Sequence, residues 1–186
     1  MINYLGISDF SVVAFIGVLF AFAVTCMAIA KLNPFLPKDL GRQFAHDGTL
    51  SAGKPRGAGI IFIFVFVIAA LLFSQINMEI TIYLCLVTIE MFTGFFDDAS
   101  EKPWGEYLKG FLDLIVAVVV ALVYLHYNTN EVTLAFANIT FEIPPVLFAL
   151  LTIVLVWASI NVTNCSDGVD GLSGTLTIIS IMTFFH

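Results

Sequence analysis

Two adjacent carboxylates, Asp97 and Asp98, are the strongest candidates for a chemical role in this sequence. They end a long apolar run, in the stretch Gly94-Phe95-Phe96-Asp97-Asp98. If that run is a helix, the pair lies at its C-terminus, where the helix dipole disfavours negative charge. The pair therefore needs a cation or a proton as partner, and Mg²⁺ is the obvious candidate because it prefers hard oxygen ligands. The alternative is a pair that water solvates at a membrane surface.

A second polar group follows the last long apolar run. Its amides and carboxylates recur at every third residue: Asn161, Asn164, Asp167 and Asp170. On a continuous helix these side chains would share one face, whereas Gly168, Gly171 and Gly174 favour a loop near the end of the stretch. In either conformation the oxygens converge, which suits a metal-bound phosphate and the hydroxyls of a nucleotide.

A third stretch, Gly53–Gly59, combines glycines with Lys54 and Arg56 directly before an apolar run. Such turns at the start of a helix can hold an anion. The stretch is not a P-loop, because Pro55 stands where the Mg²⁺-binding Ser or Thr belongs. Two interpretations stay open: a phosphate-binding turn, and a basic loop that meets anionic lipid head groups.

The composition indicates that membrane-spanning helices carry these groups. Apolar residues make up 60% of the 186 residues and charged residues 11%, against about 45–50% and about 25% in soluble domains. Five runs approach the roughly 20 residues that cross a bilayer: Phe10–Ala30, Gly59–Ile76, Ile80–Phe96, Gly110–Tyr127 and Ile143–Ile160. A sixth starts near Thr175 and reaches only about 18 Å by His186. The sequence predicts one domain over residues 1–186, an all-α polytopic membrane bundle with five full spans and the start of a sixth.

The seven basic residues predict which loops face the cytoplasm. They lie between runs one and two and between runs three and four: Lys31, Lys38, Arg42, Lys54, Arg56, Lys102 and Lys109. Under the positive-inside rule these loops are cytoplasmic, and so is the segment after run five. All three polar groups then meet the cytoplasmic side. Residues 128–142 lie outside, where alternating residues on both sides of Ala137-Asn138 predict a small β-hairpin.

Two of these motifs resemble the signatures of the polyprenyl-phosphate N-acetylhexosamine-1-phosphate transferases. They are Gly94–Asp98 and the pattern Asn161-x-x-Asn-x-x-Asp-Gly-x-Asp-Gly-Leu172, which is highly specific. The resemblance spans nearly the whole chain. It implies a ten-helix enzyme of which these residues are the N-terminal part. Further site residues of that family would follow His186, so we expect residues 1–186 to be inactive alone.

The resemblance is closest to the members that transfer phospho-N-acetylmuramoyl-pentapeptide from UDP to undecaprenyl phosphate, giving lipid I and UMP with Mg²⁺ as cofactor. It implies a step of peptidoglycan synthesis, with the site on the cytoplasmic face of the bacterial cell membrane. Matching motif positions imply catalytic roles for Asp97, Asp98, Lys109 and Asp167, metal binding by Asn164 and Asp97, and a place for Asp167 and Asp170 in the nucleotide and sugar site.

The chemistry of such a transfer suits the other polar residues. Lys54, Arg56 or Lys109 could hold phosphate oxygens, and Asn161 could bind the nucleotide. An Asp of the pair could deprotonate the lipid phosphate, or could itself attack and form a phospho-enzyme; both routes stay open. The expected partners are undecaprenyl phosphate, the UDP-linked donor and membrane lipid, while a homodimer is left open. A nucleic acid is excluded, since few basic residues exist to neutralise its phosphates.

Departures from the family pattern leave alternatives for the substrate. The usual Gly-Thr-Pro-Thr-Met-Gly-Gly stands here as Gly53–Gly59, and Asp113 replaces a usual Gln. The Pro55-Arg56 pair resembles the N-acetylglucosamine-1-phosphate transferases, so UDP-N-acetylglucosamine is the alternative donor. An ion-coupled transporter would use Glu90 and Asp113 as an ion path. A transporter should place its polar groups near the bilayer midplane, whereas these gather mostly at one face.

Overall fold

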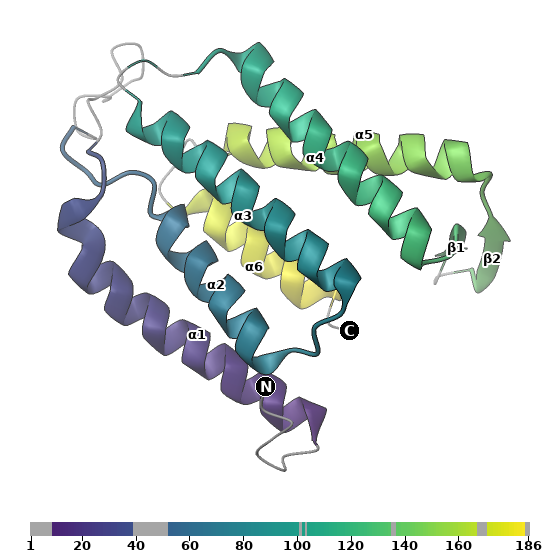
Figure 1. Cartoon of the computed structure of the whole chain (residues 1–186), viewed down its shortest axis with the longest axis horizontal. Helices are drawn as coiled ribbons and strands as arrows, with labels where there is room; N and C mark the ends of the chain where they lie inside the picture. The colour runs from purple at the N-terminus through teal and green to yellow at the C-terminus, as the bar shows by residue number, and fades with distance from the viewer. Residues whose placement is uncertain are drawn as a thin grey trace. The chain divides into compact units, whose positions relative to one another are not determined.

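The computed structural model describes residues 9–38, 52–100, 102, 104–134, 137–166 and 171–184 of a mostly helical chain (Figure 1). The chain divides into two compact units, Met1–Trp104 (unit 1) and Gly105–His186 (unit 2). Two predicted site residues, Asp167 and Asp170, lie outside the described residues.

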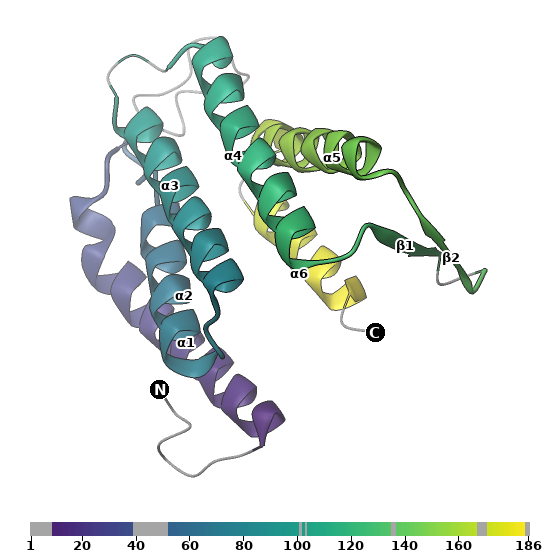
Figure 2. The same ribbon diagram turned by 45° about the vertical axis from the view of Figure 1, so that its right-hand side comes forward.

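Unit 1 is a layer of packed helices. Its described elements are α1 (Phe10–Leu32), the 3₁₀ helix η2 (Asn33–Phe35), α2 (Gly59–Phe73) and α3 (Met78–Ala99). Helix α1 packs on α2, and α2 packs on α3 (Figure 2). Gly17 permits the close approach of α1 to α2, because a Cβ there would lie 3.0 Å from the Cβ of Phe73. Helix α3 begins where the side chain of Asn77 accepts the Ile80 N–H at 2.7 Å, a standard N-cap.

Helix α2 is shorter than the run Gly59–Ile76 that was predicted. It ends at Phe73 because Ser74 turns to extended backbone, with its N–H and hydroxyl both donating to the Ala70 carbonyl. Its 15 residues span about 22 Å of a hydrocarbon core of about 30 Å. Among the described residues, four helices are long and apolar enough to cross a membrane: Phe10–Phe35, Met78–Ala99, Glu106–Tyr127 and Pro145–Cys165. The fifth full span stays a prediction.

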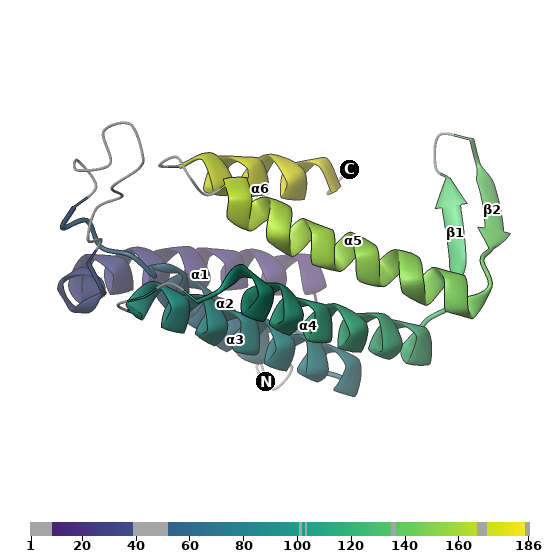
Figure 3. The same cartoon turned by 90° about the horizontal axis from the view of Figure 1, so that it is seen from above.

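Unit 2 is built on a helix pair joined by the hairpin. Its described elements are α4 (Glu106–Tyr127), β1 (Glu131–Leu134), β2 (Ile139–Glu142), α5 (Pro145–Ser166) and α6 (Leu172–Phe184). Helix α4 packs on α5, and α5 contacts α6 (Figure 3). Near the hairpin end, the rings of Tyr124 and Phe148 stack with centroids 5.6 Å apart. The other end of the pair, the start of α4 and the end of α5, carries Lys109 and Asn164.

The predicted hairpin is confirmed as an antiparallel pair. Val132 lies opposite Phe141, and Thr133 opposite Thr140. Asn138 in the connecting turn has a φ of 52°, in the left-handed region that asparagine tolerates better than most residues. Asn138 therefore lies in the turn between the two strands, as the sequence predicted.

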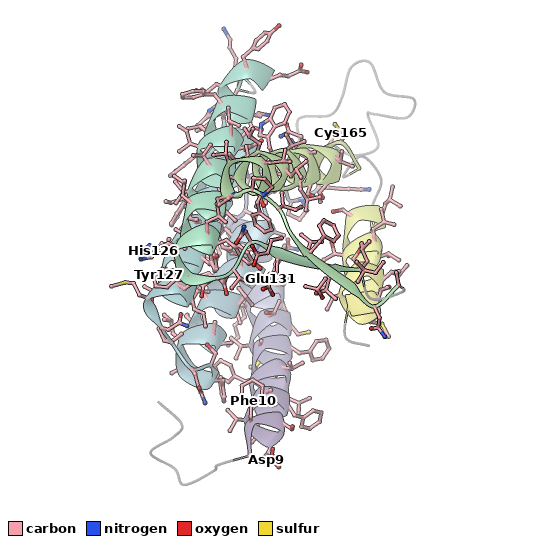
Figure 4. All side chains as sticks on the ribbon, turned by 90° about the vertical axis from the view of Figure 1, so that its right-hand side faces the viewer. Asp9, Phe10, His126, Tyr127, Glu131 and Cys165 are labelled. Carbon is pink, nitrogen blue, oxygen red and sulfur yellow. The ribbon has the colours of Figure 1, made fainter. Side chains whose placement is uncertain are left out.

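Large apolar side chains cover the outsides of the helices. Phe22 of α1 is 69% exposed and Val154 of α5 is 61% exposed, and no polar residue is buried in the described part of the chain. Figure 4 shows side chains projecting outward from the ribbons, including Phe10 at the start of α1. Helices that are apolar all round belong in lipid or in a large core. The prediction of an all-α polytopic membrane protein with a small hairpin is confirmed.

Candidate active site

An ion pair joins the end of α3 to the basic glycine stretch. The Nη2 atom of Arg56 lies 3.0 Å from Oδ1 of Asp98, and the two side chains are 38% and 32% exposed. These residues are 42 positions apart in the sequence. Because the C-terminus of a helix disfavours negative charge, the guanidinium is a suitable partner for a carboxylate there. The cation that the Asp pair required is thus, for Asp98, a side chain of the protein.

Three local features hold Arg56 at this position. The Arg56 N–H donates to the Pro37 carbonyl at 2.7 Å, and Lys38 and Pro55 form an isolated antiparallel bridge. Gly57 has a φ of +69°, and a Cβ there would lie 3.0 Å from Cδ2 of Phe95 and 3.8 Å from the Asp98 Cβ. A glycine is therefore required at position 57, both for its backbone conformation and for the close approach to α3.

Asp97 is held by the segment that follows α3. Its Oδ1 accepts the backbone N–H of Trp104 at 2.7 Å. The Trp104 indole donates to Oγ of Ser100 at 3.1 Å, and the Ser100 N–H donates to the Asp97 carbonyl at 3.2 Å. The chain after α3 thus folds back and satisfies groups of the last helical turn, which otherwise lack partners.

A second polar network joins α4 to α5 within unit 2. The amide nitrogen of Asn161 donates to Oδ2 of Asp113 at 3.2 Å and to the Trp157 carbonyl at 2.9 Å. The Trp157 indole donates to the Gly110 carbonyl at 2.8 Å. These bonds lie where α4 begins and α5 ends, next to the predicted site residues Lys109 and Asn164.

The remaining predicted site residues differ in exposure. Lys109 is half-buried on the first turns of α4, whereas Lys54 lies exposed in the loop before α2. Helix α5 continues through Ser166, so Asn161 and Asn164 lie on a helix and not in a loop. Asn164 is exposed. The structure thus brings together Arg56 with Asp98 in unit 1, where Lys54 and Asp97 also lie. Unit 2 holds Lys109, Asn161 and Asn164.

Several contacts of the site were missed by sequence reasoning. The residues are Gly57, Trp104 and Asp113, of which Asp113 was noted only as a departure from the family pattern and as part of the ion path of a transporter. A usable signal existed for Asp113, because a carboxylate inside an apolar run needs a polar partner. No comparable signal marks Trp104, whose role depends on a backbone N–H.

The described residues contain no group of three His, Cys, Asp or Glu side chains that could hold a metal ion. Mg²⁺ does not require one, since it is usually held by one or two carboxylates together with substrate phosphates and waters. The carboxylate of Asp97 and the amide oxygen of Asn164 are hard donors of the kind that this ion takes. The donor chemistry of these residues therefore fits Mg²⁺.

Residues 80–186 match the family described as glycosyl transferase family 4. That range contains Asp97, Asp98 and the Asn/Asp/Gly motif, whereas Arg56 lies before it.

The most similar relatives include several proteins named phospho-N-acetylmuramoyl-pentapeptide-transferase. The one from Treponema pallidum strain Nichols is 36% identical over 180 residues, covering 95% of this chain and 50% of the relative. Those from Clostridium acetobutylicum and Bacillus subtilis strain 168 are each 28% identical, over 91% and 87% of this chain and 57% and 55% of the relatives. The chain spans about half the length of these curated relatives. By its matched motifs and its coverage, the chain belongs to glycosyl transferase family 4.

Proposed function

We propose that the chain forms part of an enzyme that transfers phospho-N-acetylmuramoyl-pentapeptide from its UDP donor to undecaprenyl phosphate. The products are lipid I and UMP, in peptidoglycan synthesis. The observation that carries the proposal is the Arg56–Asp98 ion pair at 3.0 Å. It joins a basic glycine turn to the Asp pair, which supports a site that combines a cation for phosphate with carboxylates for acid–base work. The names of the relatives support the choice of substrates.

Phosphoryl transfer needs mainly positioning and charge neutralisation. An oxygen of the lipid phosphate forms a bond to the sugar-bearing phosphorus of the donor, and the bond from that phosphorus to UMP breaks. In the direct route an Asp of the pair takes the proton of the lipid phosphate. In the two-step route a carboxylate oxygen of the pair attacks first, and the lipid phosphate then displaces it. Both carboxylates lie at the end of α3, and this position supports giving them these roles.

Basic and polar side chains would hold the substrates. Arg56, Lys54 and Lys109 suit the phosphate oxygens, because charge-assisted hydrogen bonds are the strong ones. Asn161 and Asp170 suit the nucleotide and sugar. Their motif positions assign Asp97 and Asn164 to Mg²⁺, which would neutralise charge on the pyrophosphate and the leaving UMP.

We place the site on the cytoplasmic face of a bacterial cell membrane. The distribution of basic residues supports this topology. Cysteine substitutions at Lys54, Lys102 and Asn138, with the native Cys165, test it by labelling from each side with an impermeant reagent. Residues 54, 102 and 165 should react from the cytoplasmic side and residue 138 from outside. Labelling of residue 54 from outside would contradict the proposed topology.

The catalytic assay uses the complete protein with undecaprenyl phosphate, Mg²⁺ and UDP-N-acetylmuramoyl-pentapeptide, following UMP release. Asp97→Asn should lower turnover by about 10²–10⁴-fold, the usual contribution of a general base. Glu131→Gln is the matched control, because this exposed carboxylate lies on the hairpin. Equal rates for the two variants would contradict the assignment of Asp97.

The alternative donor is UDP-N-acetylglucosamine, which the Pro55-Arg56 pair favours. The same assay with this donor decides between the two sugars. Faster UMP release with UDP-N-acetylglucosamine would identify the chain as part of the related N-acetylglucosamine-1-phosphate transferase.

A further inference from the structure

We propose that Asp113 is a positioning residue, which fixes the amide of Asn161 so that its Oδ1 atom is the group offered to the UDP-linked donor. The inference rests on the proposed function and deepens it. Asp113 lies on α4 and Asn161 on α5, 48 positions apart in the sequence, and their side chains meet at 3.2 Å.

The orientation of the Asn161 amide follows from the chemistry of its neighbours. The Trp157 carbonyl, 2.9 Å away, can only accept a hydrogen bond, so the amide nitrogen and not the oxygen must face it. The second N–H of the same nitrogen goes to Oδ2 of Asp113. Both donors of the amide are then used, and among the described residues nothing occupies Oδ1, which is the atom offered to a ligand.

An amide oxygen in this position selects the kind of group that it can bind. Oδ1 only accepts hydrogen bonds, so it can take a hydroxyl or N–H of the donor nucleotide, but it repels a bare phosphate oxygen. Lys109 stands one helical turn before Asp113 on α4, and Asn164 one turn after Asn161 on α5, so both share these faces. Asp113 thereby fixes the hydrogen-bond acceptor of the site, and phosphate binding is left to Lys109.

A neighbouring bond between the same two helices provides a matched control. The Trp157 indole donates to the Gly110 carbonyl at 2.8 Å, about one turn from the Asp113–Asn161 contact. Neither Trp157 nor Gly110 belongs to the proposed substrate or metal site. Trp157→Phe removes this bond and keeps the Trp157 backbone carbonyl that Asn161 uses. It therefore weakens the α4–α5 contact without releasing the Asn161 amide.

The test is a double-mutant cycle in the complete protein, with Asp113→Leu, Asn161→Leu and the double variant. Asp113→Leu should lower kcat/KM for the UDP donor about tenfold, mainly through KM, which corresponds to about 1.4 kcal/mol. In the Asn161→Leu background the same change should cost nothing further. Asp113→Asn keeps an acceptor oxygen and should stay within about threefold of the parent. Trp157→Phe should lower the melting temperature and leave KM unchanged.

Several outcomes would overturn the positioning role. They are unchanged KM in Asp113→Leu, a further tenfold loss in the Asn161→Leu background, or an equal rise of KM in Trp157→Phe. If the leucine variant does not fold, Asp113→Ala replaces it in the cycle. Calorimetric binding of UDP to the same proteins separates this inference from the proposed function. If the Asp113 and Asn161 substitutions have coupled effects on UDP binding but the parent shows no turnover, only the proposed transfer reaction is contradicted. If their effects on UDP binding are additive, the role of Asp113 is refuted.

Discussion

In unit 1 the contact Arg56–Asp98 joins a loop to the end of a helix, whereas in unit 2 Asp113–Asn161 joins two helices, near the start of α4 and the end of α5. The first is a charge pair with about a third of each side chain exposed, and such pairs contribute about 0–1 kcal/mol to stability. The second is a hydrogen bond, also part-buried, next to another bond between the same helices. We expect the charge pair to exchange its partner for a substrate phosphate, and the interhelical bond, which the neighbouring bond reinforces, to keep its geometry. This contrast predicts that substitutions at the unit 1 contact lower activity more than they lower the free energy of unfolding.

Among the substitutions that test this contrast, Arg56→Leu should have the largest effect. Loss of a charge-assisted bond to phosphate should lower kcat/KM roughly 10- to 100-fold, while the free energy of unfolding falls by less than about 1 kcal/mol. Steady-state kinetics and denaturant unfolding measure the two. A large loss of stability with normal kinetics would show that the pair is structural and would remove the contrast between the units.

Gly57→Ala should have the next largest effect. The residue has a φ of +69° and its Cβ would lie 3.0 Å from Phe95, so the loop must move away from α3 and take Arg56 with it. The backbone term costs about 1–2 kcal/mol, and we expect turnover to fall about tenfold. Gly53→Ala is the control, because Gly53 has a φ of +85° but a Cβ added there would meet no atom within 4 Å. Equal turnover in the two variants would mean that the close approach is unimportant.

Trp104→Phe should have a smaller effect. It removes the 3.1 Å indole bond to Ser100 but keeps the backbone N–H that holds Asp97. One neutral hydrogen bond contributes about 0.5–1.5 kcal/mol, so we expect a decrease in turnover of about threefold. UMP release measures it, and a loss as large as that of Asp97→Asn would indicate that the indole itself contacts substrate.

The smallest effect is expected at the hairpin, the end of unit 2 away from the polar network. Glu131 lies directly opposite Glu142, and like charges in that register are unfavourable. Glu131→Lys should raise the free energy of unfolding by about 0.2–1 kcal/mol and leave transfer unchanged. A change in the transfer rate would show that the hairpin communicates with the site.

Much of the fold could be predicted because its signals are local. The apolar runs predicted the helices to within a few residues at most ends, and the alternation around Asn138 predicted the hairpin. The position of Asp97 and Asp98 in the last turn of α3 was likewise evident from the run that precedes them. The early end of α2 was not, because Ile76 is as apolar as the helix and the polar pair Ser74 and Gln75 gives little warning.

The amino-acid sequence was enough to indicate which residues could do the chemistry and at which ends of the helices they stand, since composition and periodicity act over neighbouring residues. Their partners became evident only from the packing of the chain. Arg56 meets Asp98 across 42 positions, and Asp113 meets Asn161 across 48. Such pairs depend on how helices pack and where a glycine lets a loop approach, and no local pattern encodes that geometry. The Trp104 N–H on Asp97 is the extreme case, because a backbone group carries no sequence signal at all.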